Sequence, residues 1–249
     1  MQHTRTAFVV GGTGGLGRAI CEALARNGHR VFLTWRGNKV LADEIVGAIG
    51  DGRAVAARMD LTDPDSLSHA LEACDTAFGP PDGVVFAPGV RIQQPFVSAI
   101  TPGQWQDVIE TELLGLTRLV SRTVPLLRET QGSLTVITSV ATAAYPPGDA
   151  LSAVPKAGME MLVRALAREE GRYGVRANCV APGLMQAGLG ADFIDTLYTP
   201  EIWEALRRRI ALRRFGRAED VADIVAFLAS SAAAYVTGQT IYADGGFRL

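Results

Sequence analysis

The stretch TAFVVGGTGGLG, residues 6–17, decides the fold of this chain. Its first half predicts a short buried strand, and the amphipathic pattern of residues 16–27 predicts a helix directly after the glycines. Glycines at such a turn let the backbone approach a pyrophosphate, which the free amide groups at the helix N-terminus attract. The residues predicted to hold a dinucleotide in this way are Gly11, Thr13, Gly14, Gly15, Leu16 and Gly17. An ordinary turn without a ligand is the alternative interpretation.

Outward from this turn, short apolar runs alternate with segments of helical period. The predicted strands cover residues 6–10, 31–34, 54–59, 83–87, 133–138, 176–180 and 240–243. The predicted helices cover residues 16–27, 64–78, 103–128, 152–172 and 218–230. Strands that alternate with helices form parallel sheets through right-handed crossovers, with helices on both faces. The predicted fold class is therefore α/β, a Rossmann-like doubly wound parallel seven-stranded sheet.

One domain is expected to include the whole chain, residues 1–249, because no linker, repeat or low-complexity tract interrupts the pattern. With 48% hydrophobic residues the chain can bury one large core. Residues 184–212 contain no strand pattern, and long connections of this kind often carry function, so we predict a substrate lid there. The apolar residues of this segment, which indicate either an apolar or aromatic substrate or a packing face, are Leu184, Met185, Leu189, Phe193, Leu197, Tyr198 and Trp203.

Composition argues against several classes of partner. The net charge is −2 and no basic block or acidic tail is present, so neither nucleic acid nor a membrane surface is expected to bind. The N-terminal apolar run is too short for a signal peptide or a membrane span. Cys21, Cys74 and Cys179 lie far apart in the sequence, which is typical of buried thiols in a reducing compartment. We expect a cytoplasmic protein that binds small molecules and no metal.

The end of the second predicted strand indicates which dinucleotide binds. An acidic residue there binds the adenosine ribose hydroxyls of NAD, whereas an arginine favours the 2′-phosphate of NADP. The sequence at this point reads Thr34, Trp35, Arg36, with no acidic residue. Arg36 is suited to a bidentate phosphate contact and Trp35 to a place beside the adenine, which favours NADP(H). The alternative is an Arg36 side chain that only faces solvent.

Lysine is rare in this chain. Of its 24 basic residues only Lys39 and Lys156 are lysines. A flexible ammonium group hydrogen-bonds a ribose better than a guanidinium group does, and burial lowers its pKa more readily. We therefore predict a chemical role for Lys156.

Together with the glycine turn, further motifs resemble the classical short-chain dehydrogenases/reductases nearly from end to end. Asp60 and Leu61 match the pair that meets the adenine in that family. Residues 178–183, NCVAPG, match its loop beside the nicotinamide, and residues 235–246, YVTGQTIYADGG, match its C-terminal signature. The resemblance implies further cofactor contacts at Ala87, Gly89, Lys156, Pro182, Gly183 and Met185. It also implies a homodimer or homotetramer, with the helices near residues 103–128 and 152–172 at one interface.

The catalytic residues of that family are matched only in part. Its mechanism uses a serine that binds the substrate oxygen, a tyrosine that moves the proton, and a lysine that holds the ribose and lowers the tyrosine pKa. Ser139 and Lys156 fall at the serine and lysine positions, but Ser152 stands at the tyrosine position. A serine hydroxyl donates a hydrogen bond but is too weak an acid to replace a phenol. The resemblance therefore implies a divergent member without the catalytic tyrosine.

Other positions near the nicotinamide also depart from the family pattern. Glu112 stands at the position of its asparagine and Ala187 at that of a threonine. Asp149, seven residues before Lys156, stands where the enoyl-reductase branch has its tyrosine, so that pattern is not met either. Glu112 is expected either to pair with Lys156, to act as a buried acid or base, or to face solvent. Tyr145, on the loop after the fifth predicted strand, is either a replacement phenol or a packed loop residue.

Three functions remain open at this point. The first is an NADP(H)-dependent reductase of a carbonyl or conjugated enoyl or enone substrate, in which Ser139, Ser152 and Lys156 donate hydrogen bonds to the oxygen that becomes negative. Its protonating group is Tyr145, Glu112 or water. The second is a non-redox cyclase, dehydratase or isomerase with Glu112 as its base. The third is a catalytically silent subunit that pairs with an active paralogue.

Overall fold

The computed structural model of this chain describes residues 5–90, 92–187 and 199–249. Seven parallel strands form one sheet in the order β3-β2-β1-β4-β5-β6-β7. The strands are β1 (Thr6–Val10), β2 (Arg30–Trp35), β3 (Ala54–Arg58), β4 (Gly83–Phe86), β5 (Ser133–Ile137), β6 (Arg176–Pro182) and β7 (Thr240–Ala243). The predicted fold class is confirmed. Successive strands are added in one direction from β1 to β3 and in the opposite direction from β4 to β7, so the order reverses between β1 and β4. Ligands of doubly wound sheets bind beyond the carboxyl ends of such a pair of strands.

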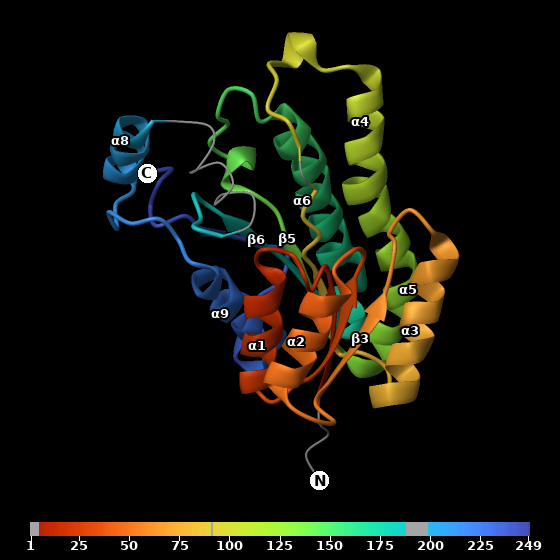
Figure 1. The fold of residues 1–249 in the computed structure, drawn as a ribbon. Helices are drawn as coiled ribbons and strands as arrows, with labels where there is room; N and C mark the ends of the chain where they lie inside the picture. Colours follow the sequence, from red (N-terminus) through yellow and green to blue (C-terminus); the bar gives the residue numbers. More distant parts are fainter. Residues whose placement is uncertain (1–4, 91, 188–198) are drawn as a thin grey trace.

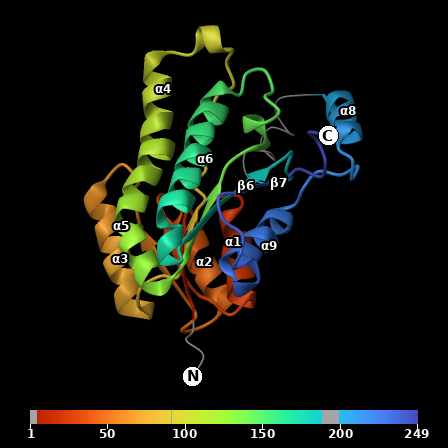
Figure 2. The ribbon, with the colours of Figure 1, turned by 180° about the vertical axis from the view of Figure 1, so that it is seen from behind.

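Helices cover both faces of the sheet (Figures 1 and 2). One layer contains α1 (Gly17–Arg26), α2 (Lys39–Ile49) and α9 (Ala218–Ala229), and the other contains α3 (Pro64–Phe78), α5 (Gly115–Thr130) and α6 (Ala150–Glu170). Successive side chains of a strand point to opposite faces, so Ala7 and Val9 pack in one core while Phe8 and Val10 pack in the other. Because both faces are buried, the central strands read as continuous apolar runs.

One long, nearly continuous helical segment extends beyond the sheet (Figure 1). Helix α4 (Pro102–Val108) continues through a π-helical segment, η2 (Ile109–Leu114), into α5. The remaining elements are α8 (Pro200–Arg209) and the 3-10 turns η1 (Val97–Ala99), η3 (Val140–Thr142), η4 (Gly171–Tyr173) and η5 (Ser231–Ala233). In the part of the chain that the structure describes, no helix is both long and apolar enough to cross a bilayer.

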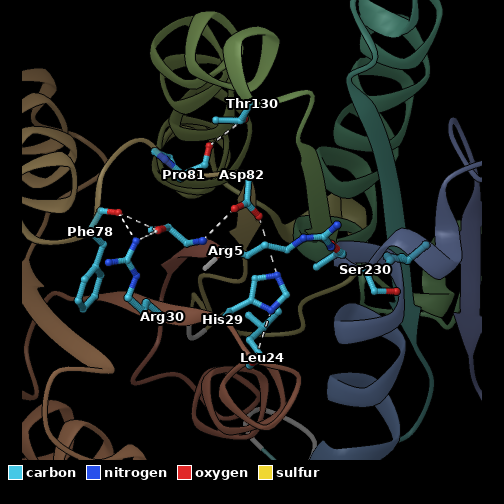
Figure 3. Close-up of polar contacts among 12 residues, drawn as sticks. Arg5, Leu24, His29, Arg30, Phe78, Pro81, Asp82, Thr130 and Ser230 are labelled. Carbon is cyan, nitrogen blue, oxygen red and sulfur yellow. Dashed lines mark hydrogen bonds and ion pairs between the residues drawn. The ribbon is translucent and has the colours of Figure 1, made fainter. Parts of the chain in front are cut away.

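A partly buried polar cluster lies at the opposite end of the sheet, at the amino ends of the strands (Figure 3). Asp82 accepts a hydrogen bond from the Thr6 amide at 2.9 Å, and its other carboxylate oxygen lies 3.9 Å from Nε2 of His29. The His29 side chain is only 1% exposed. Arg30 donates to the Phe78 carbonyl at 2.6 Å and also lies over the Phe78 ring. These contacts tie the first two strands to the loops beneath them, far from the crevice at the other end.

Candidate functional site

The glycine turn lies between β1 and α1, at the carboxyl edge of the sheet. Gly11 has φ +79°, and a Cβ atom there would lie 2.6 Å from the carbonyl oxygen of Ala87. A Cβ atom at Gly17 would overlap the main chain of Gly11 and Gly12. Only glycine fits these two positions without strain, because only glycine lacks the Cβ atom. The turn is therefore as tight as the sequence pattern predicts.

The N-terminus of α1 has no cap of its own. Its N-cap residue, Leu16, makes no side-chain hydrogen bond to the first turn, and that turn contains no acidic residue. Amide groups at a helix N-terminus need acceptors, and the positive end of the helix dipole favours an anion. The turn and the uncapped helix together fit the pyrophosphate of a dinucleotide.

A cavity of about 320 Å³ extends from this turn across the ends of β1 and β2, and we call it the glycine-turn cavity. The predicted residues that line it are Gly11, Thr13, Gly14, Trp35, Arg36, Leu61 and Gly89. Arg36 is exposed at its rim, where a bound phosphate group would meet it. The cavity lies where the adenosine half of a dinucleotide that occupies the glycine turn would extend.

Asp60 is positioned differently from its neighbours. Met59 and Leu61 line the glycine-turn cavity, whereas the Asp60 carboxylate accepts hydrogen bonds from the Thr62 amide at 3.0 Å and the Thr62 hydroxyl at 2.8 Å. These bonds lower the pKa of Asp60 below its ordinary value. The pair is thus fixed as a charged turn, with Leu61 toward the cavity.

Arg58 is a residue of this region that sequence reasoning missed. It pairs in register with Trp35, and its Nε lies 3.5 Å from the Arg36 carbonyl oxygen. The signal was available, because parallel strands β2 and β3 end together and place their last residues side by side. The end of β2 therefore presents two guanidinium groups.

A second cavity, of about 250 Å³, lies beyond β4 and β5, and we call it the serine–lysine cavity. The predicted residues that line it are Gly15, Leu16, Ala87, Gly89, Glu112, Ser139, Ser152, Lys156, Pro182, Gly183 and Met185. Pro88, Gly89 and Val90 line both cavities. The two hollows adjoin, so one extended ligand can occupy both.

The two serine hydroxyls face the same cavity from different elements. Ser139 begins the turn η3 after β5, and its oxygen accepts a hydrogen bond from the Ala141 amide at 3.1 Å. Ser152 lies in the first turn of α6, one helical turn before Lys156. Within the described residues, neither hydroxyl donates a hydrogen bond to the protein, so both hydrogens are available to a ligand oxygen.

Glu112 and Lys156 form a buried ion pair in this cavity. The Lys156 ammonium donates to both carboxylate oxygens, at 2.8 and 2.6 Å. The two side chains are 15% and 5% exposed, for Lys156 and Glu112 respectively. Glu112 belongs to the π-helical segment η2, a distortion that is frequent at functional sites. Of the positions expected for Glu112, the structure shows the pair with Lys156.

Tyr145 and Asp149 are the two remaining residues that the sequence analysis considered for proton transfer. Tyr145 is 50% exposed and does not line the serine–lysine cavity. Asp149 does line it, is 8% exposed, and accepts a hydrogen bond from Gln94 Nε2 at 3.1 Å. Burial raises the pKa of Asp149. Sequence reasoning set Asp149 aside because it is not a tyrosine, although its position was the available signal.

The predicted lid is described only in part. Leu184, Met185 and Trp203 line the serine–lysine cavity, and α8 carries Trp203. Leu189, Phe193, Leu197 and Tyr198 lie outside the described residues. In residues 5–90, 92–187 and 199–249, no group of three or more histidine, cysteine or acidic side chains is placed to hold a metal ion.

Comparison with known proteins agrees with this geometry. The family profile of enoyl-(acyl carrier protein) reductases matches residues 11–248. The chain is 34% identical to the 3-oxoacyl-[acyl-carrier-protein] reductase FabG of Staphylococcus aureus (strain N315), over 100% of both chains. It is 33% identical to FabG of Escherichia coli (strain K12), over 98% of both chains. This chain belongs to the short-chain dehydrogenase/reductase family.

Solved structures of the short-chain dehydrogenase/reductase family superpose on the whole fold. One from Brucella melitensis gives a TM-score of 0.91 at 27% identity, over 99% of this chain and 98% of that one. One from Serratia marcescens BCRC 10948 gives 0.89 at 26% identity, over 98% of both chains. Short-chain dehydrogenase/reductase membership accounts for the sheet and the glycine turn, but a fold does not by itself assign a substrate.

Proposed function

We propose that this protein is an NADP(H)-dependent reductase of a carbonyl or conjugated enoyl or enone substrate, with Ser139, Ser152 and Lys156 in its site and no catalytic tyrosine. The observation that carries this proposal is the pair of adjoining cavities, which place two free hydroxyls and an ammonium group at the end of the glycine turn. A dinucleotide bound along both cavities supplies a hydride. The matched family and the reductase names of the curated relatives support the same reaction class.

The serine hydroxyls stabilise the charge that develops during reduction. Hydride addition to a carbonyl or to a conjugated alkene leaves negative charge on the substrate oxygen. Hydrogen-bond donors already aimed at that oxygen act strongly in a site from which water is excluded. Ser139 and Ser152 supply these donors, and Leu184, Met185 and Trp203 contribute apolar side chains to the lining of the same cavity.

Lys156 keeps one ammonium hydrogen beyond the two that Glu112 accepts. That third donor is suited to a ribose hydroxyl of the cofactor. Both Glu112 oxygens already accept hydrogen bonds from the Lys156 ammonium, so the pair argues against the alternative in which Glu112 alone abstracts a proton. Nothing in the described site favours the silent-subunit alternative.

Arg36 and Arg58 support the choice of NADP(H) over NAD(H). Both guanidinium groups lie at the ends of β2 and β3, and the glycine-turn cavity opens at Arg36. A guanidinium group binds a phosphate with two parallel hydrogen bonds. We therefore place the 2′-phosphate of NADP at Arg36, with Arg58 beside it.

We also propose that copies of this chain pair through α5 and α6. Three large apolar residues stand exposed at or near these helices, Leu114 at 39%, Val154 at 53% and Met161 at 59% exposure. Closed two-fold pairing buries one such face against its own copy. Light scattering that gives the mass of a monomer at micromolar concentration would overturn this assembly.

Lys156→Ala tests the proposed reaction. We expect NADPH oxidation with a ketone or enone substrate to fall at least about 100-fold, because the ribose contact that positions the cofactor beside the substrate is lost. Lys39→Ala is the matched control, because Lys39 is the other lysine of the chain and pairs with Asp43 on the exposed face of α2. Equal rates in the two variants would contradict the proposed role of Lys156.

A further inference from the structure

We infer that Asp149 is the general acid of this site, the group that protonates the substrate oxygen after hydride addition. The inference rests on the proposed reductase function and supplies the proton donor that the function lacks. Ser152 cannot provide that proton, because an aliphatic hydroxyl is too weak an acid.

Asp149 occupies a helix N-cap but does not cap the helix. At the start of α3, Asp63 accepts hydrogen bonds from the amides of Asp65 and Ser66, which is the ordinary use of an aspartate at this position. At the start of α6, Asp149 makes no side-chain cap bond. Asp149 lines the serine–lysine cavity instead, and the hydrogen bond to its carboxyl group comes from Gln94. Helix α6 therefore lacks the stabilising side-chain cap that Asp63 gives to α3, and the Asp149 carboxyl group is available for another role.

The Asp149 carboxyl is held in position from a second loop. Gln94 donates to it at 3.1 Å, and the neighbouring Gly148 has φ +89°. A Cβ atom at Gly148 would lie 2.9 Å from the Gln94 carbonyl oxygen, so the two loops touch closely there. The Asp149 carbonyl accepts the Ser152 amide at 3.1 Å, which fixes the acid relative to the serine hydroxyl that binds substrate.

The charges around Asp149 differ from those around Glu112. Glu112 contacts the Lys156 ammonium directly through both carboxylate oxygens. Within the described residues, no cation lies within ion-pairing distance of Asp149. The charge of Lys156 acts on Asp149 from farther away and lowers its pKa. Burial raises the pKa of Asp149 above 3.8 and the charge of Glu112 raises it further, against the Gln94 hydrogen bond and Lys156. In enzymes that use two carboxyl groups in one site, different environments push the two pKa values apart, and the group with the raised pKa acts as the acid.

The proposed step balances as a reduction. The substrate gains a hydride at carbon from the reduced nicotinamide dinucleotide, and the π electrons of its C=O or conjugated C=C bond move onto oxygen. The Asp149 O–H bond breaks and a new O–H bond forms on the substrate, which gives an alcohol or an enol that tautomerises in water. The oxidised dinucleotide and the Asp149 carboxylate remain, and water reprotonates the carboxylate. A bound substrate would shield Asp149 further from solvent, and such desolvation favours the protonated form of a carboxyl group.

Asp149→Asn tests this assignment, because asparagine keeps the shape and the Gln94 contact but has no proton to give. We expect kcat to fall about 100-fold or more, as general acids contribute, while NADPH affinity stays unchanged. The wild-type kcat should fall as pH rises through the pKa of Asp149, and the variant should lack that fall. Asp63→Asn, an aspartate-to-asparagine change at another N-cap, is the matched control and should keep both the rate and the pH profile.

Infrared spectroscopy of the unliganded protein gives a second readout that needs no turnover. The wild-type spectrum minus that of Asp149→Asn should contain the carbonyl band of a protonated carboxyl group at a pH above 3.8, because the other carboxyl groups contribute equally to both spectra. The inference is overturned if both proteins show the same band, or if Asp149→Asn keeps the wild-type rate and pH profile. In the latter case the reductase function stands. If the wild type transfers no hydride to any ketone or enone, the function and the inference fall together.

Discussion

Glu112 illustrates what a single position can and cannot predict. From the sequence, Glu112 was predicted to lie near the site, and a pair with Lys156 was one of three expected arrangements. It could not choose among a pair, a free acid and a solvent-facing side chain, because the choice depends on which side of the helix faces the cavity. The π-helical segment shifts the residues of η2 relative to α4 and α5, and no pattern of helical period predicts such a shift.

Removing one charge of this pair should be costly. Glu112→Gln leaves the Lys156 ammonium without its partner in a largely buried place, which we expect to lower the free energy of unfolding by about 3 kcal/mol. Glu110→Gln is the control from the same segment. Its partner is Arg118, and the two side chains are 37% and 27% exposed, so the expected loss is about 0–1 kcal/mol. Urea denaturation measures both values, and equal losses would show that the Glu112 pair contributes no more than a surface pair.

At the scale of elements, the strands and most helices followed from the sequence, and α2 did not. The strands are short apolar runs bounded by polar or glycine residues, a pattern that is visible without a structure. Helix α2 contains Gly47, and its apolar residue Val40 is 70% exposed, so its apolar residues do not all mark one buried face and the helix was missed. Asn38, whose side chain accepts a hydrogen bond from the Leu41 amide at 3.0 Å, was the available start signal.

The loop between α1 and β2 carries a buried histidine that makes stability depend on pH. Burial lowers the pKa of His29 below 6.5. The negative charge of Asp82 partly opposes this shift, whereas the positive charge of Arg5 adds to it. The unfolded chain therefore binds a proton near pH 6.5 that the folded chain does not bind. This contribution to stability is fully present above pH 6.5 and is lost as pH falls below it, by at most about 1.4 kcal/mol per pH unit.

His29→Gln should reduce the loss of stability between pH 6.5 and lower pH, because the group that must take up the proton is gone. His69→Gln, on the exposed face of α3, is the control and should keep the wild-type dependence. Urea midpoints measured across this pH range give the comparison. A wild-type slope in the His29 variant would show that other groups cause the acid sensitivity.

At the scale of the whole molecule, the sequence predicts the architecture better than the chemistry. The alternation of strand and helix and the glycine turn define a doubly wound sheet, because topology rules leave few other arrangements. The site depends on loops that approach from different parts of the chain, such as Gln94 against Gly148 and Asp149. Contacts of this kind have no local pattern, so the sequence showed the place of Asp149 in the family motif but not that Asp149 lines the cavity.

Every role proposed for the site residues requires a nicotinamide dinucleotide along the two cavities, and calorimetric titration measures that binding. We predict that NADPH binds the wild type at least about ten-fold more tightly than NADH does, a difference of about 1.4 kcal/mol, and that Arg36→Ala removes this preference. Absence of binding heat with either cofactor at several temperatures, and no displacement of one by the other, would contradict the account.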